Sequence, residues 1–313
     1  AVPAAALMRL GWRPRFDLRT SDQMRAIARL MAPTVFGSAI YLVNMAVSRL
    51  VGLSLDDASA TVLNLSSRLM ELPIGVFAVA VTTVVFPLIS RHAAQGDWTG
   101  LTDAYRRGMR LILITNIPAA VGLALIAGPV IRVLFQRGAF SSSDTALMTP
   151  VLAVYALGLP FVSFVNLALR AFYAEKDTTP PVRAALLTFI VNLVLSLASM
   201  HHLGTLGLAL AGNVAIVVQA VYLQSHLSRK RPSLGFSFLL RDVLRIALAS
   251  LLMGGVVFAW IVGWHRVAGD SLWHQAIEVA VAIALAVPVY GALLWVLRIE
   301  GRDEVLAWIK ARR

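Results

Sequence analysis

The sequence predicts an all-α, polytopic membrane protein with eight transmembrane helices. Three observations predict this class. Of the 313 residues, 58% are hydrophobic and 14% are charged, and the mean hydropathy of +0.77 is too high for a soluble globular domain. The apolar residues gather in eight runs, each close to the roughly 20 residues that an apolar helix needs to cross a bilayer. The charged residues gather mostly between these runs.

The predicted spans follow one another with short loops between them. Residues 92–110, between the second and third spans, predict a short amphipathic helix at the membrane surface, and the C-terminal residues 299–313 predict another. Proline within the spans, as at Pro73 and Pro118, predicts kinks, which transmembrane helices tolerate. The eight spans cover residues 30–52, 60–88, 109–135, 146–172, 182–200, 205–226, 239–263 and 273–298.

The basic residues are distributed unevenly between the two sides of the predicted membrane. The net charge is +12, but 23 of the 28 Lys and Arg residues fall in the termini and in alternate loops on one side. This is the pattern of membrane topology, and it argues against nucleic acid as a partner. The positive-inside rule then predicts that both ends of the chain are cytoplasmic. The chain opens on Ala1 without an initiator methionine, so we expect further sequence upstream.

No pattern typical of an enzyme is present. The sequence has no cysteine, no HExxH, no GxSxG and no P-loop, so we expect no catalytic residue, metal or cofactor. His201 and His202 could contact a metal, but a histidine pair in an interfacial loop is the preferred interpretation.

One arginine is predicted to lie deep in a transmembrane span. Arg68 is about eight residues into the second span, roughly 12 Å at 1.5 Å per residue, and a central charge there costs roughly 2.5–3.5 kcal/mol. Glu71 is three residues further and shares its helix face, so a self-neutralising structural pair is one interpretation. The other is that Arg68 faces a water-filled cavity and presents its guanidinium to an anionic substrate such as phosphate. Candidate substrate-binding residues are therefore Arg68, Glu71, Ser67 and Asn64.

Other polar residues within the spans predict contacts between helices. Asn192 and Ser196 share a helix face at i, i+4, and Asn44 lies in the first span. Hydrogen bonding between helices is the default interpretation. A cation site formed by these three residues is the alternative.

Three blocks of sequence also resemble one known family. They are SRLMELPIGVFAVAVTTVVFPLISRH (67–92), VLFQRGAFSSSDT (133–145) and LRAFYAEKDTTPPVR (169–183). In order and spacing they resemble the MurJ (MviN) family of lipid II flippases, of the multidrug/oligosaccharidyl-lipid/polysaccharide (MOP) exporter superfamily. The resemblance implies two six-helix lobes followed by a final helix pair. The eight spans resemble the family's seventh to fourteenth helices, so the resemblance implies an N-terminal lobe as partner.

For individual residues the resemblance implies specific roles. Arg68 matches the cavity arginine that is thought to engage the lipid II pyrophosphate, and Glu71 matches the acidic residue of the same motif. Ser67 stands where many members have aspartate, so the local charge balance differs. Asn44 and Ser196 stand where some relatives are thought to bind sodium through acidic residues, and both are neutral here.

The resemblance also implies a domain organisation and a function. Residues 1–29 would form a cytoplasmic basic segment, 30–231 a six-helix lobe, 232–298 a final pair with a lipid-tail groove, and 299–313 a cytoplasmic amphipathic tail. The implied function is flipping of lipid II outward across the bacterial inner membrane by alternating access, for peptidoglycan synthesis. A flippase for another polyprenyl-linked glycan, or a non-transporting membrane protein that binds lipid or a partner, is the alternative.

Overall fold

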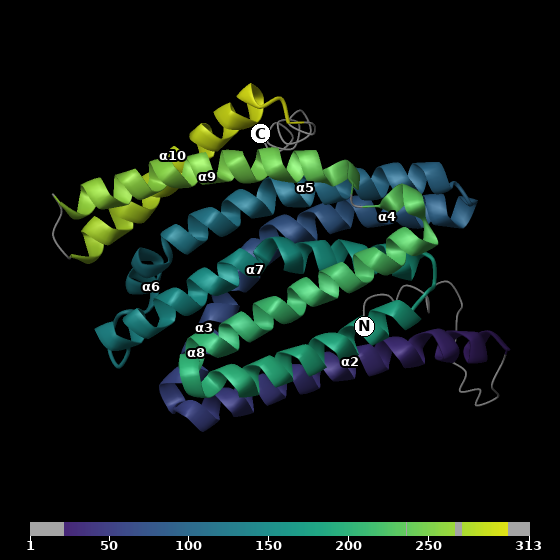
Figure 1. Ribbon diagram of the computed structural model, residues 1–313, viewed down its shortest axis with the longest axis horizontal. Coiled ribbons are helices and arrows are strands. Elements are labelled where there is room, and N and C mark those ends of the chain that lie inside the picture. Colours follow the sequence, from purple (N-terminus) through teal and green to yellow (C-terminus); the bar gives the residue numbers. More distant parts are fainter. Residues whose placement is uncertain (1–21, 236, 267–270, 300–313) are drawn as a thin grey trace, which may run out of the picture.

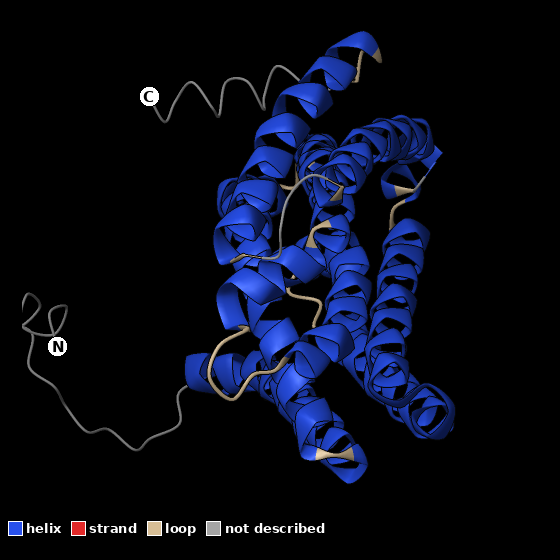
Figure 2. Ribbon diagram, turned by 90° about the vertical axis from the view of Figure 1, so that its left-hand side faces the viewer, coloured by secondary structure: helices blue, strands red, loops and turns tan. Residues whose placement is uncertain are grey.

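The computed structural model describes residues 22–235, 237–266 and 271–299, and every regular element in these ranges is a helix. Short loops join the helices (Figure 2). The predicted surface helix, residues 300–313 of the tail, and most of the basic segment 1–29 lie outside the described residues. In chain order the elements are α2 (Asp22–Leu55), α3 (Asp57–Pro73), the π-helix η1 (Ile74–Val79), α4 (Ala80–Gln95), α5 (Trp98–Leu125), α6 (Ala127–Phe135), α7 (Ser142–Ala174), α8 (Thr179–Lys230), the 3₁₀ turn η2 (Pro232–Leu234), α9 (Ser237–His265) and α10 (Leu272–Val296).

The all-α membrane class is confirmed, while the count of eight spans depends on how two elements are counted. In the described part of the chain, six helices are long and apolar enough to cross a membrane, and a bent helix pair raises the number to seven. One of the six, α8, has 52 residues. At 1.5 Å per residue that is about 78 Å, more than twice the ~30 Å hydrocarbon layer.

Gly204 divides α8 into two arms. Its φ of +53° and ψ of −134° are non-helical, and a residue with a Cβ rarely adopts this backbone conformation. The arms fold back on each other, since a Cβ on Gly207 would lie 2.8 Å from Ser199 Oγ. Figure 1 shows the arms as a hairpin, teal then green. The turn falls at the predicted loop 201–204, and counting the two arms separately gives the predicted eight spans.

The second predicted span is not one straight helix. It consists of α3, η1 and α4, with an angle of 55° between Asp57–Val76 and Val81–Gln95. Pro73 ends α3, and the π-helix follows it directly. The break lies between Val76 and Val81, so the bend falls a few residues after Pro73 rather than at the predicted kink. Proline disturbs the turn that precedes it, and the π-helix Ile74–Val79 covers the segment where the direction changes.

The prediction of a separate surface helix at 92–110 was wrong, because this segment forms the end of α4 and the beginning of α5. The Asp97 side chain caps α5 by accepting a hydrogen bond from Gly100 N, and α5 then continues without interruption to Leu125. The apolar face of this segment does not lie on lipid. Leu101, Tyr105 and Met109 are fully buried within the protein.

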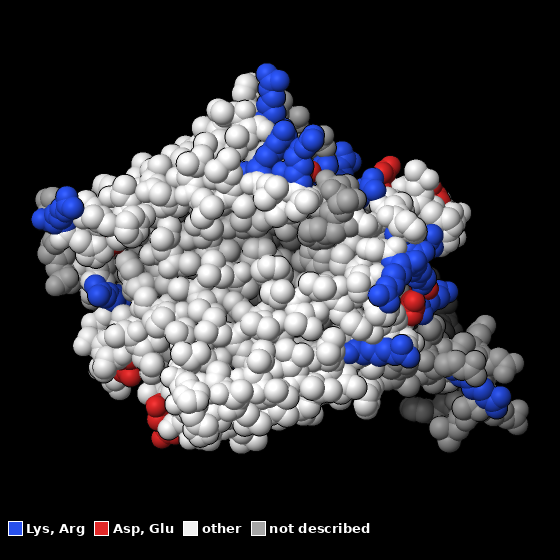
Figure 3. All heavy atoms as spheres, in the orientation of Figure 1, with Lys and Arg blue, Asp and Glu red and all other residues white. Residues whose placement is uncertain are grey.

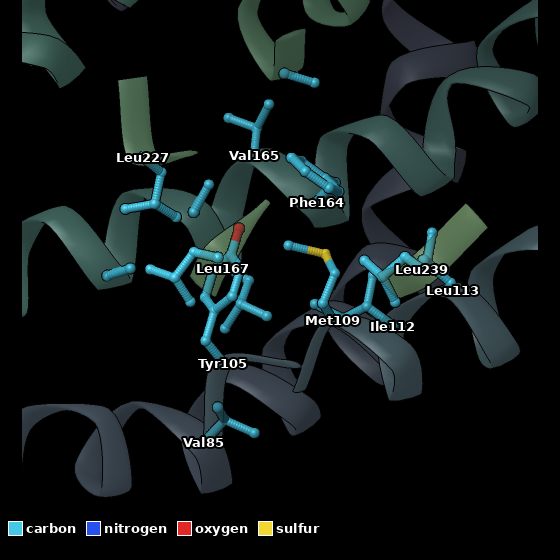
Figure 4. Close-up of a cluster of buried hydrophobic side chains, with 14 of the residues drawn as sticks. Val85, Tyr105, Met109, Ile112, Leu113, Phe164, Val165, Leu167, Leu227 and Leu239 are labelled. Atoms are coloured by element: carbon cyan, nitrogen blue, oxygen red, sulfur yellow. The ribbon is translucent and has the colours of Figure 1, made fainter. Parts of the chain in front are cut away.

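The larger hydrophobic core joins α5 to α4, α7, α8 and α9. Figure 4 shows Tyr105, Met109 and Ile112 on α5 pointing toward Leu167 and Phe164 of α7. Gly108 lets α4 approach closely, because a Cβ there would lie 2.8 Å from Val85 Cγ1. The Tyr105 hydroxyl donates to Gln224 Oε1 at 3.0 Å. Burial of this hydroxyl is therefore compensated by a hydrogen bond.

The helices are arranged around α7. This helix packs against α3, α4, α5, α6 and α8, while α2 packs on α8 at one edge and α9 and α10 pack on α5 and α6 at the other (Figure 1). Polar links fix the last helix pair. Arg110 Nε bonds Asp242 Oδ2 at 2.8 Å, and the Tyr290 hydroxyl donates to the Ile114 carbonyl at 2.7 Å.

Candidate functional site

The second span presents two chemically different faces. Ser59, Val62, Ser66 and Met70 of α3 are buried at helical spacing against the rest of the protein. The opposite face is exposed and polar. It carries Asn64, Ser67, Arg68 and Glu71, the four predicted substrate-binding residues. The structure thus brings these four residues together on one unburied surface in the middle of an apolar span, which we call the α3 polar face.

Arg68 is oriented by its neighbour one turn earlier. Its Nε donates to Asn64 Oδ1 at 3.1 Å. The Ser67 hydroxyl donates to the Asn64 backbone carbonyl at 2.8 Å, so this side chain is satisfied within its own helix. Arg68 lies 11 residues after Asp57, about 16 Å along the helix and near the middle of a ~30 Å layer. The guanidinium is therefore held at mid-span on the exposed face of α3.

Glu71 does not neutralise Arg68. In the described part of the chain no hydrogen bond or ion pair joins the two side chains, although both lie on the α3 polar face. The structure thus forms the i, i−4 contact with Asn64 and leaves the i, i+3 contact with Glu71 unmade. An exposed, unneutralised arginine in a span can bind an anion through its planar fork of donors.

The bend in the second span begins next to this face. Pro73 is five residues after Arg68, and η1 follows at Ile74–Val79. π-helical turns occur mostly as single insertions in α-helices and frequently at functional sites. A change in the bend would move the α3 polar face relative to α4.

Two of the three candidate cation-site residues, Asn44 and Asn192, form a hydrogen-bonded contact between α2 and α8. Asn192 Nδ2 donates to Asn44 Oδ1 and to Ser48 Oγ, each at 2.9 Å. Asn192 and Ser196 are both buried. The side-chain NH₂ group of Asn192 lies between the oxygens of Asn44 and Ser48 and donates a hydrogen bond to each. This is the geometry of a hydrogen-bonded link between helices.

Sequence reasoning missed two parts of this picture. Ser48 completes the Asn44–Asn192 contact, and its position four residues after Asn44 could have indicated that. Glu278, inside the last predicted span, is 2% exposed. A carboxylate in an otherwise apolar run was the available signal. In the described ranges no three His, Cys, Asp or Glu side chains are placed to hold a metal ion.

Comparisons with known proteins point to one family. The family model described as "Lipid II flippase MurJ" matches residues 1–276. A Vibrio cholerae protein named "Probable lipid II flippase MurJ" is 30% identical over an alignment of 299 positions, which covers 93% of this chain and 55% of that protein. A Thermosipho africanus "Lipid II flippase MurJ" is 34% identical over 196 residues, 63% of this chain and 38% of that protein. The chain spans about half the length of the curated relatives it matches.

Solved structures give the same result. One described as "Lipid II flippase MurJ, inward closed conformation" matches with a TM-score of 0.71 and 26% identity, over 91% of this chain and 57% of that chain. An outward-facing multidrug resistance MATE family transporter of the MOP superfamily matches with a TM-score of 0.60 and 19% identity, over 90% of this chain and 66% of that chain. The second match shows a shared fold alone. The motifs at 67–92, 133–145 and 169–183 therefore indicated the correct family.

Proposed function

The chain belongs to the lipid II flippase MurJ family, and we propose that it forms the C-terminal half of a transporter that moves lipid II outward across the bacterial inner membrane. The observation that carries this proposal is the exposed Arg68 guanidinium at mid-span, oriented by Asn64 and not paired with Glu71. The pyrophosphate of lipid II is a suitable ligand, because guanidinium and phosphate form bidentate, charge-assisted hydrogen bonds.

An N-terminal lobe is proposed to complete the cavity. The α3 polar face is exposed. The neighbouring helix α2 is exposed too, since only 6% of the most apolar stretch of its span, Val35–Leu55, is buried within the protein. The relatives are about twice as long as this chain. A second lobe facing α2 and α3 would enclose the polar face in a water-filled cavity, which removes the cost of exposing Arg68 to lipid.

Transport would then proceed by alternating access. The two lobes rock about the headgroup while the polyprenyl chain remains in lipid along the last helix pair, α9 and α10. An anion moving outward across an inside-negative membrane gains about 2.3 kcal/mol per charge per 100 mV. The membrane potential can therefore drive export without nucleotide hydrolysis.

The proposed orientation follows from charge. Both ends of the chain are placed in the cytoplasm by the positive-inside rule. In Figure 3 the Lys and Arg side chains gather toward the end of the molecule where α4 meets α5 and α7 meets α8, and few lie at the opposite end. Substrate would enter from the basic, cytoplasmic side.

The function is tested by measuring lipid II at the outer surface of cells. The natural protein containing this chain is expressed in bacteria depleted of their own flippase, and lipid II exposed on spheroplasts is measured with a membrane-impermeant probe. Restored lipid II exposure supports the proposal. Restored exposure of a different polyprenyl-linked glycan, with lipid II still confined inside, would assign another substrate, and no exported glycan would exclude transport.

A further inference from the structure

The buried face of α10 carries two polar side chains that the proposed transport does not use. Gln275 and Glu278 are 8% and 2% exposed, and Ala282 continues the same face. Glu278 lies six residues after Leu272, the first residue of α10. The helix is strongly apolar, with a mean hydropathy of 2.3 over its most apolar stretch. The face packs against α9 and α6, with Val257, Val279 and Ile126 in the adjoining apolar cluster.

Both side chains have an acceptor oxygen that receives no hydrogen bond. Within the described ranges, Glu278 Oε1 and Gln275 Oε1 are buried and lack a partner. Buried polar atoms are almost always hydrogen-bonded, and each exception requires an explanation. Here two unsatisfied acceptors lie three residues apart on one helix face, where side chains are neighbours.

The charged groups around Glu278 leave this oxygen without a donor. On α9, His265 Nδ1 is 3.8 Å from Glu278 Oε1, too far for a hydrogen bond, and lies 2.9 Å from the Ile261 carbonyl. On α6, the charge of Arg132 interacts electrostatically with the Glu278 carboxyl. On α10 itself, His274 Nδ1 contacts Ser271 Oγ at 2.6 Å, and α5 contributes the apolar Leu125. A buried carboxylate without donors is strongly disfavoured.

One proton would satisfy both acceptors. We propose that Glu278 and Gln275 form a proton-binding site in the last helix pair, in which Glu278 is a neutral carboxylic acid whose O–H donates to Gln275 Oε1. When α10 separates from α9 and α6 and water enters, the O–H bond breaks and the proton passes to water. The carboxylate left behind faces Arg132 and His265, whose side chain is 50% exposed. Occupancy by the proton is thereby linked to the packing of α10.

Two tryptophans report on this site. Trp260 Nε1 donates to the Glu278 carbonyl at 3.3 Å, and Trp264 Nε1 donates to the His274 carbonyl at 3.2 Å. Their rings stack with centroids 5.2 Å apart. Because both are anchored to α10, movement of α10 away from α9 changes their environment and their fluorescence.

Infrared spectroscopy of the full chain in liposomes tests the proposal directly. At neutral pH the wild type should show the C=O stretch of a protonated carboxylic acid, which Glu278→Gln removes and Glu71→Gln, a change on the exposed face of α3, retains. Gln275→Leu should retain the band at higher wavenumber, since it loses a hydrogen bond. A wild-type spectrum without this band, or a band unaffected by Glu278→Gln, would overturn the proposal.

A pH titration of tryptophan fluorescence gives a second readout that does not depend on transport. Raising the pH should produce a spectral shift in the wild type that Glu278→Gln abolishes and Trp260→Phe diminishes. A shift that persists in Glu278→Gln would contradict the link between the proton and helix packing. Displacement of the infrared band by sodium at constant pH would identify a cation site instead. None of these outcomes bears on whether the protein flips lipid II.

Discussion

Asn64 Oδ1 accepts a hydrogen bond from Arg68 Nε at 3.1 Å, and this contact, rather than an ion pair with Glu71, orients the mid-span guanidinium in the described structure. An amide oxygen positions the arginine without cancelling its charge. Glu71 lies on the same exposed face but leaves the terminal nitrogens of Arg68 available to an anion. If Arg68 is a structural partner of Glu71, mutations of these two residues should have one set of effects. If Arg68 is a ligand of the substrate, they should have the opposite effects.

Arg68→Ala in the natural protein should abolish growth complementation while the protein remains inserted and abundant. A charge-assisted hydrogen bond contributes roughly 1.5–3 kcal/mol, so lipid II exposure should fall by about 10- to 100-fold. Arg68→Lys should fail partly or wholly, because a point charge cannot reproduce the bidentate fork. Arg49→Ala, a change of an exposed arginine on the neighbouring α2, is the matched control and should stay close to wild type.

The double variant Arg68→Ala/Glu71→Ala separates the two interpretations. If Arg68 only neutralised Glu71, removing both should restore folding and transport together. A phosphate ligand predicts that the double variant is folded and inactive. Full lipid II exposure in the double variant would rule out the ligand role.

The sequence predicted the spans well and the path of the chain between them less well. The break between the apolar runs 182–200 and 205–226 predicted the turn at Gly204 correctly. The segment 92–110 was misassigned because an amphipathic pattern is the same whether its apolar face meets lipid or protein. Only the packing of Tyr105 and Met109 against α7 and α8 decides between them.

The sequence was enough to select the candidate residues of the α3 polar face, but not to predict their contacts. Arg68 has a possible partner at i−4 and another at i+3, and both spacings bring side chains together on a helix. The side-chain conformations decide which contact forms, and these do not follow from spacing. Glu278 was missed for a related reason, since its burial depends on α6 and α9 packing over it.

The orientation of the chain can be tested with single cysteines, since the sequence has none of its own. Ser142, at the start of α7, and Ser233, in η2, are both exposed. If the basic side is cytoplasmic, a membrane-impermeant thiol reagent applied to intact cells should label Ser142→Cys and not Ser233→Cys. After permeabilisation both should react. Labelling of Ser233→Cys in intact cells would reverse the orientation.

Asn192 is expected to stabilise the packing of α8 on α2 rather than to bind a cation. Its amide donates to both Asn44 Oδ1 and Ser48 Oγ, so Asn192→Leu should lower the free energy of unfolding by about 0.6–2 kcal/mol. The loss should be equal in sodium and potassium buffers. Thr188→Val, which removes a hydroxyl bonded within α8, is the control. A stabilisation of the wild type specific to sodium, and absent in Asn192→Leu, would favour the cation site.

The proposed tail groove predicts a position-dependent effect of charge on α9 and α10. Val256 is 41% exposed, and Val281 is partly buried on the facing helix. An arginine at either site costs roughly 2.5–3.5 kcal/mol at mid-span, as it would at the exposed Val221 of α8. Val256→Arg and Val281→Arg should therefore reduce lipid II exposure more than Val221→Arg at equal protein levels. Equal activity of all three variants would exclude a groove here.

Four charged residues and one tryptophan tie the α7–α8 loop to the ends of α8 and α5, forming an arrangement that we call the basic-end clasp. Glu175 Oε1 and Oε2 bond Arg231 Nε at 2.8 Å and Lys230 Nζ at 2.7 Å. Lys230 also bonds Asp177 at 2.9 Å, and the Arg231 guanidinium lies 3.5 Å from the centroid of the Trp98 ring. The Glu175 side chain is 6% exposed, so its two ion pairs are largely shielded from water.

The clasp should lose its contribution to stability in acid. Burial alone would raise the pKa of Glu175, but hydrogen bonds from Lys230 and Arg231 and their charges lower it below the usual value of 4.5. A carboxyl whose pKa is lower in the folded state than in the unfolded state contributes fully to the stability of the fold above its unfolded-state pKa. This contribution is lost as the pH falls through the folded-state pKa. Thermal unfolding followed by tryptophan fluorescence in detergent should therefore show a fall in Tm below about pH 4.5. For Glu175→Gln we expect the free energy of unfolding at pH 7 to fall by about 1–3 kcal/mol, a value between those of exposed and buried ion pairs. The Tm of this variant should also fall less in acid than that of the wild type. Asp103→Asn, at an exposed position on α5, should retain the wild-type profile. If Glu175→Gln follows that profile too, the clasp does not stabilise the fold through this carboxylate.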